Sequence, residues 1–192
     1  AADGEVDFTG AMGVNLMFNE ELDGYAWGGG ACASFDGAYG CLRATWNPPW
    51  AFLNLAALAH EMGHGYVLPH SDNSDGDADT YDNPCDLMSD AWRHAGSDPV
   101  YGLLPKYINA YQRERLGWVA PAGRLTVQAE DIGTHDVMLD TADTVGGSGV
   151  QLLVLALPTQ PDPFATVVYI VEARRRTTPY ESNLAGDAVI IH

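Results

Sequence analysis

The chain has 192 residues, of which 46% are hydrophobic and 18% charged. This composition fits one compact domain or two small packed subdomains and excludes an intrinsically disordered protein. Nine basic residues stand against 26 acidic ones, giving a formal net charge of −17. Such a surface repels phosphate backbones and anionic lipid headgroups, so we expect neither nucleic acid nor membranes as partners.

The first fifty residues predict strands, over residues 5–19 and 41–46, and a hairpin between them. Asp36-Gly37, between two β-prone runs, is typical of a two-residue hairpin turn. Around this turn Cys32 and Cys41 fall opposite each other at a non-hydrogen-bonded pair, close enough for a disulfide. We expect that bond, with two buried thiols as the alternative; it would indicate an oxidising, extracellular compartment.

A long helix is expected next. Pro48-Pro49 predicts a helix start, and from Trp50 to Met62 the apolar residues recur on nearly all sides. We therefore expect a buried helix that ends near residues 63–65. A long loop should follow over residues 65–101, and a stretch of this kind in a compact domain is usually functional. A second helix is expected over residues 105–116.

Only strands are predicted beyond residue 118, over residues 124–129, 135–139, 150–157, 165–173 and 187–192. The expected fold class is α+β. A first part with a mixed sheet and two helices, residues 1–118, precedes a β-rich part, residues 119–192, that packs on it. The last strand ends abruptly at His192, so we expect the natural chain to continue.

The pentapeptide HEMGH at residues 60–64 lies on the predicted buried helix. Residues four apart share a helix face, so the imidazoles of His60 and His64 can bind one metal ion. Glu61 can reach a water on that metal without being a ligand. His70 is the expected third ligand, with Asp72 as the alternative. Three neutral histidines and an open fourth position are typical of a catalytic zinc site.

Met88 lies in a tight polar loop downstream. The pattern from His60 to His70 resembles the extended zinc motif of metzincin metallopeptidases, and Met88 resembles their Met-turn. The surroundings are similar to those of gametolysin-like and immune-inhibitor-A-like secreted bacterial peptidases. The similar stretches are residues 46–50, 68–71, 81–84 and 111–118.

The resemblance implies that residues 1–118 are a metzincin-like catalytic domain in which His60, His64 and His70 bind Zn²⁺. It further implies that Glu61 is the general base and that Met88 forms an apolar floor under the metal. By the same analogy the substrate would lie extended along an edge strand near residues 41–46.

Two positions depart from the family pattern. Val67 stands where metzincins have a glycine that takes a positive φ, a conformation that a β-branched residue resists. Either the turn is made differently, for example with Gly65, or His70 is displaced. No tyrosine closely follows Met88, so we do not expect the switching tyrosine ligand of some metzincins.

An acidic loop follows the zinc motif. Asp75, Asp77 and Asp79 alternate along the chain, as ligands of a hard cation do, so Ca²⁺ is a possible second cofactor. Thr80 occupies the glycine position of an EF-hand loop, and a merely solvated acidic loop is the alternative.

Three other features have plain structural explanations. The run Arg174-Arg175-Arg176 predicts the solvated end of a strand rather than a substrate site. Most of the tryptophans, at positions 46, 50, 92 and 118, are expected in the core. Cys85, left without a partner, is expected to be a free buried thiol.

The sequence thus predicts a monomeric, secreted zinc endopeptidase that acts on a protein or peptide substrate. Two alternatives remain open. One is a non-catalytic, calcium-stabilised pseudo-peptidase that keeps the fold and only binds its partner. The other is a zinc amidase that acts on a substrate other than protein.

Overall fold

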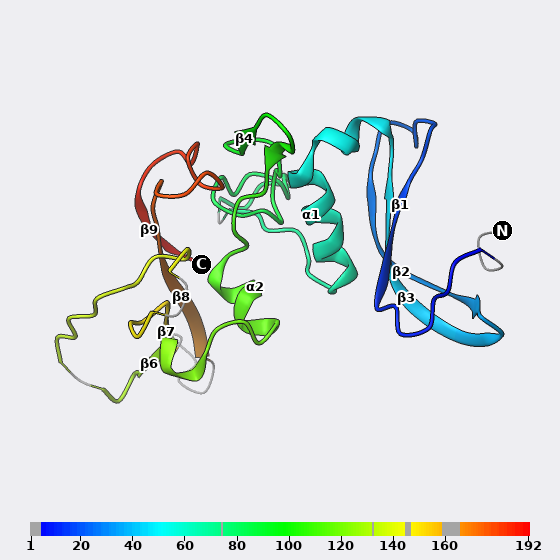
Figure 1. Ribbon diagram of the computed structural model, residues 1–192. Coiled ribbons are helices and arrows are strands. Elements are labelled where there is room, and N and C mark those ends of the chain that lie inside the picture. Colours follow the sequence, from blue (N-terminus) through cyan, green and yellow to red (C-terminus); the bar gives the residue numbers. More distant parts are fainter. Residues whose placement is uncertain (1–4, 74, 132, 145–146, 159–165) are drawn as a thin grey trace.

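The computed structural model describes residues 5–73, 75–131, 133–144, 147–158 and 166–192 (Figure 1). Within these ranges the chain forms two α-helices and three β-sheets, so the fold is of the mixed α+β class. Figure 1 shows the helices between an N-terminal sheet and a C-terminal sheet. In the described part of the chain, no helix has the length and apolarity needed to cross a membrane.

The N-terminal sheet has the strand order β1-β3-β2. Strand β1 (Gly13–Met17) is parallel to β3 (Ala38–Asn47), and β2 (Trp27–Phe35) is antiparallel to β3. Strand β3 is therefore central, and the expectation that residues 41–46 form an edge strand is wrong. The edge nearest the helix α1 (Leu55–Gly65) belongs to β2.

The β2–β3 hairpin confirms the predicted turn and disulfide. Asp36 and Gly37 have φ values of 49° and 78°, as a two-residue hairpin turn requires. Cys32 and Cys41 are paired in register, with their Cα atoms 4.0 Å apart, and form a disulfide. Cys85 is a free thiol and is only partly buried.

The predicted first helix is divided at Asn54. A 3₁₀ helix, Pro49–Leu53, comes first, and α1 begins at Leu55. The Asn54 side chain accepts a hydrogen bond from the Ala57 amide at 3.0 Å, which caps α1 and fixes its start.

Helix α2 (Ala110–Arg115) is shorter than expected. It begins only after Asn109, whose side chain accepts a hydrogen bond from the amide of Gln112. Residues 105–109 form no helix, and the buried Lys106 among them donates hydrogen bonds to three backbone carbonyls in the segment 84–93. That segment also runs into a small unpredicted sheet of β4 (Gly96–Asp98) and β5 (Gly102–Leu104).

The C-terminal sheet has the strand order β6-β7-β8-β9. After a 3₁₀ turn at Pro121–Gly123, its strands are Arg124–Gln128, Leu152–Pro158, Thr166–Arg174 and Ala188–Ile191. Leu152, Val154 and Ile170 pack against Ala110 of α2, which joins the sheet to the helical part.

One expected strand is absent. Residues 135–139 form no strand, and only Leu139 bridges to Val150. Residue 165, where another strand was expected to begin, lies outside the described residues. The division at residue 118 stays a prediction.

Candidate metal centre

Three histidines converge at one end of α1. His60 is buried on the helix, His64 is one turn further along, and His70 returns from the segment after the helix. The Nε2 atom of His64 lies 3.1 Å from the Nε2 atoms of both His60 and His70. Nitrogen ligands about 2.0–2.1 Å from a tetrahedral zinc would be about 3.3 Å apart, so the three imidazoles fit that ion.

The proton positions on two of these rings make the metal assignment stronger. His60 Nδ1 lies 2.8 Å from the carbonyl oxygen of Leu87, and His64 Nδ1 lies 2.9 Å from that of Leu68. A carbonyl only accepts, so each Nδ1 donates and each Nε2 of the neutral ring carries a lone pair. Burial lowers the pKa of His60 to about 4, so this ring is neutral at physiological pH. Where both rings are neutral, the two Nε2 lone pairs 3.1 Å apart repel each other, and a cation bound between them removes that repulsion.

Val67 makes the turn that brings His70 to the cluster. Its φ is +63°, the left-handed conformation that the family's glycine would take, and its side chain is 78% exposed. Gly65 is not needed for the turn, and Asp72 is not part of the cluster. Because Val67 points into solvent, the strain of a β-branched residue at positive φ costs stability without displacing His70.

Met88 is fully buried against α1. A Cβ added at Gly63 would lie 3.0 Å from Met88 Cε and closer still to its Sδ, so the helix and the Met88 loop approach through a glycine. Leu87, beside Met88, supplies the carbonyl that orients His60. The loop therefore holds the histidine cluster in place in two ways, through the apolar contact of Met88 with Gly63 and through the hydrogen bond of Leu87 with His60.

Glu61 lies half-buried beside the cluster, on the wall of a cavity of about 550 Å³ that His60 also lines. Burial raises the pKa of Glu61 to about 7. A carboxyl group with a pKa near neutrality can both accept and release a proton, as a general acid–base catalyst must.

Tyr81 completes the centre, and sequence reasoning missed it. Its hydroxyl lies 3.1 Å from His70 Nε2, and its ring centroid lies 4.4 Å from that of His70. Burial and the charge of Glu61 raise the pKa of Tyr81, so the phenol keeps its proton and can donate a hydrogen bond. The sequence offered one signal, since Tyr81 begins the family-like stretch 81–84. It did not place the ring, because the fold of the intervening loop decides where that ring points.

The acidic loop brings together a slightly different set of carboxylates from the expected one. Asp75 and Asp77 group with Asp82, with ligand atoms within 4.8 Å of one another. Asp79 is not in this group and instead accepts a hydrogen bond from the amide of Tyr81 at 2.9 Å. Calcium binding stays a prediction.

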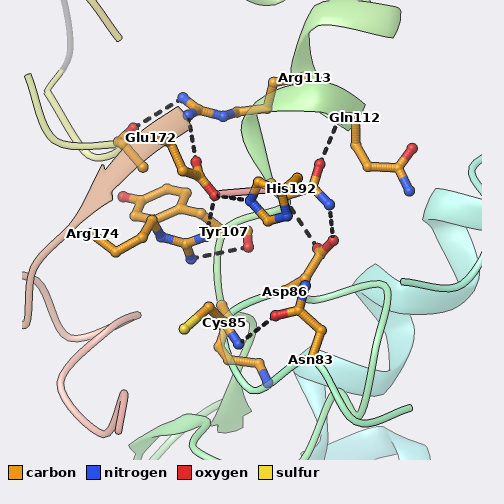
Figure 2. A network of polar contacts seen from close by, with 12 residues as sticks. Asn83, Cys85, Asp86, Tyr107, Gln112, Arg113, Glu172, Arg174 and His192 are labelled. Atoms are coloured by element: carbon orange, nitrogen blue, oxygen red, sulfur yellow. Dashed lines mark hydrogen bonds and ion pairs between the residues drawn. The ribbon is translucent and has the colours of Figure 1, made fainter. Parts of the chain in front are cut away.

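A buried polar network joins the Met88 loop to the C-terminal sheet (Figure 2). Arg174 is fully buried and pairs with Glu172 and Glu181, so the expectation that it lies at a solvated strand end is wrong for this residue. Glu172 also pairs with Arg113 of α2 at 3.2 Å. The neighbouring Arg175 is exposed, as expected.

The same network reaches the Met88 loop through Asp86. The buried Asp86 carboxylate accepts hydrogen bonds from the Met88 amide and from both the amide and the side chain of Asn109. Asn109 caps α2, so the position of the loop under the histidines is tied to the start of that helix.

The chain was compared with protein-family models, with curated proteins and with solved structures, and none of the three comparisons gave a match.

Proposed function

We propose that this chain is a secreted, zinc-dependent endopeptidase with a metzincin-type catalytic centre. The observation that carries the proposal is the convergence of three imidazole Nε2 atoms, two of them with the proton fixed on Nδ1, beside a half-buried carboxyl group. Such a set has no evident use in a protein without a metal, since burying unpaired imidazole nitrogens costs stability.

The arrangement of the elements supports the metzincin type. Strand β3 leads into α1, the antiparallel edge strand β2 lies against that helix, and the Met88 loop lies below it. Of these relations, the position of the Met88 loop against the zinc helix is the one that the motif resemblance implies. Among the described residues, β2 pairs with β3 alone, so its other edge can pair with an extended peptide.

His60, His64 and His70 would hold the zinc ion, which supplies the Lewis acidity that acidifies water and polarises a carbonyl. Glu61 takes a proton from the attacking water and passes it to the leaving amine. The Tyr81 hydroxyl lies beside His70, where it can donate to the oxygen that becomes negative as the carbonyl is attacked.

The test compares the wild type with Glu61→Gln, both loaded with zinc, on an unfolded protein substrate, by counting new amino termini over time. We expect the variant to retain the metal, because Glu61 is not a ligand, and to cut roughly 10²–10⁴-fold more slowly, because it lacks the proton carrier. Glu20→Gln, an exposed glutamate away from the cavity, is the control and should cut at the wild-type rate.

The outcomes separate the three functions. Cutting by the wild type but not by Glu61→Gln supports the peptidase. If both proteins hold zinc and neither cuts protein, the peptidase proposal fails. Release of an amine from a non-peptide amide would then favour the amidase, and inertness towards both substrates would favour the binding module.

A further inference from the structure

The cavity beside Glu61 extends well past the histidines and has its own chemical character. Its volume is about 550 Å³, and it opens between α1, the segment before β2 and the segment that follows the Met88 loop. The residues that give it this character are Tyr25, Trp50, Tyr81, Asp90 and Trp92. No arginine or lysine lines it among the described residues.

The walls of the cavity are aromatic. The rings of Trp50 and Trp92 meet at an angle of 56°, with their centroids 5.1 Å apart. Trp92 is 53% exposed and Tyr25 is 65% exposed, so the expectation of a core position is wrong for Trp92. An aromatic face attracts a cation held within about 6 Å of it. In the part of the chain that the structure describes, the cation–π contacts lie elsewhere, on Tyr66 and Tyr111.

Asp90 adds a negative charge to this aromatic wall. Its Oδ1 accepts hydrogen bonds from the amides of Trp92 at 2.8 Å and Arg93 at 3.1 Å, which hold the carboxylate in place. Over the described ranges, no basic side chain lies within 4.0 Å of this carboxylate to form an ion pair. The buried ammonium of Lys106 donates to the Asp90 backbone carbonyl and attracts the Asp90 charge, but Lys106 does not line the cavity. The cavity therefore offers a fixed anion and aromatic faces, with no arginine or lysine among the described residues that line it.

We propose that this cavity binds an arginine side chain of the substrate, next to the bond that is cut. A guanidinium is planar, so it can stack on Trp50 or Trp92 while its N–H groups pair with Asp90. A lysine has the charge without the planar face. An aromatic side chain would stack but leave Asp90 unpaired, and an acidic side chain would be repelled by Asp90 and Glu61. The inference rests on the proposed function, because only a peptidase presents this cavity with a bond to cut.

The experiment uses two series of peptides, each with a single cleavable bond. In one series the residue before that bond varies, and in the other the residue after it varies. The varied residue is arginine, citrulline, lysine, phenylalanine or glutamate. Citrulline has the shape of arginine without its charge. We expect the arginine peptide of one series to be cut with a kcat/KM at least about tenfold above that of its citrulline partner, as a stacked and paired guanidinium provides.

The matched variants are Asp90→Asn and Asp98→Asn. The Asp98 Oδ1 accepts hydrogen bonds from the amides of Val100 and Tyr101 in the same local arrangement as Asp90, but Asp98 lies outside the cavity. Asparagine keeps the accepting oxygen and removes the charge at both sites. Asp90→Asn should cut arginine and citrulline peptides equally well, and Asp98→Asn should discriminate as the wild type does. Trp92→Leu, at a half-exposed position, should also weaken the preference for arginine.

A binding assay separates the two proposals. Fluorescence anisotropy measures the affinity of zinc-loaded Glu61→Gln for the same peptides. If the wild type cuts nothing while this variant binds the arginine peptide about tenfold more tightly than the citrulline peptide, the peptidase proposal fails and the arginine site stands. If peptides are cut but arginine and citrulline are equivalent in both assays, the peptidase stands and the arginine site is refuted. A preference for phenylalanine, or one for arginine that persists in Asp90→Asn, refutes it as well.

Discussion

Replacing Gly28 with alanine should displace Glu61, beside the metal centre, and so lower the activity. Gly28 lies on β2, directly against the turn of α1 that carries Glu61. A Cβ at this position would lie 2.7 Å from the Cα of Glu61 and closer still to its carbonyl oxygen, whereas ordinary van der Waals contact begins at 3.4 Å. Because all the opposing atoms are backbone, no side-chain rotation relieves the overlap, and the strand and helix must move apart.

The size of the effect follows from that overlap. Overpacking of this kind costs about 1–3 kcal/mol of folding stability. A displacement of roughly 1 Å at a catalytic group lowers a rate by about 10²-fold. We therefore expect Gly28→Ala to melt at a lower temperature and to lose about two orders of magnitude in kcat/KM, measured on zinc-loaded protein.

Gly29→Ala is the matched control on the same strand. A Cβ at Gly29 would meet no atom within 4 Å. This variant should keep its activity and be as stable as the wild type or slightly more so, because alanine costs less entropy than glycine in a strand. If Gly28→Ala were as active and as stable as Gly29→Ala, β2 would not pack on α1 at Glu61, and the argument would fail.

Three further predictions concern stability. Val67→Gly should raise the free energy of unfolding by up to about 1 kcal/mol in chemical denaturation. Glycine removes the strain of an L-residue in the left-handed conformation, and this gain outweighs the backbone entropy that glycine loses on folding. A free energy of unfolding below that of the wild type would contradict the strain at this turn. Arg174→Met should lower the free energy of unfolding by about 3–5 kcal/mol, because it leaves buried carboxylates unpaired. Arg175→Met, at an exposed position, should change the free energy of unfolding by less than about 1 kcal/mol. Equal effects of the two substitutions would refute the buried network. In metal-free protein, Glu61 holds its proton up to a pKa of about 7, against 4.5 in the unfolded chain, so its protonated form favours folding at low pH. As pH rises from 4.5 to 7, thermal melts should therefore show the wild type losing stability relative to Glu61→Gln, and parallel curves would rule out this titration.

Local signals in the sequence predicted much of the fold and of the centre. The Asp36-Gly37 turn fixed the hairpin register and with it the Cys32–Cys41 bond, because a two-residue turn leaves only one pairing. The spacing of His60 and His64 placed both imidazoles on one helix face, because helical periodicity alone decides it.

The features that escaped prediction depend on contacts between distant segments. The central position of β3 follows from its parallel pairing with β1, which no local pattern encodes. Helix α2 begins later than expected because Lys106, which precedes it, donates hydrogen bonds to carbonyls of the loop before β4. Tyr81 reaches His70 only because the acidic loop between them folds back on itself.

Lys106 is the single lysine of the chain, and its burial has a practical consequence. The residue is 1% exposed, and its ammonium group donates to the carbonyls of Pro84, Asp90 and Arg93, on both sides of Met88. Reagents that acylate or cross-link lysine thus find no accessible side-chain amine on the folded protein. Acylation of Lys106, read by mass spectrometry, would therefore report the opening of the loop beneath the histidines at this one position, without a change to the sequence.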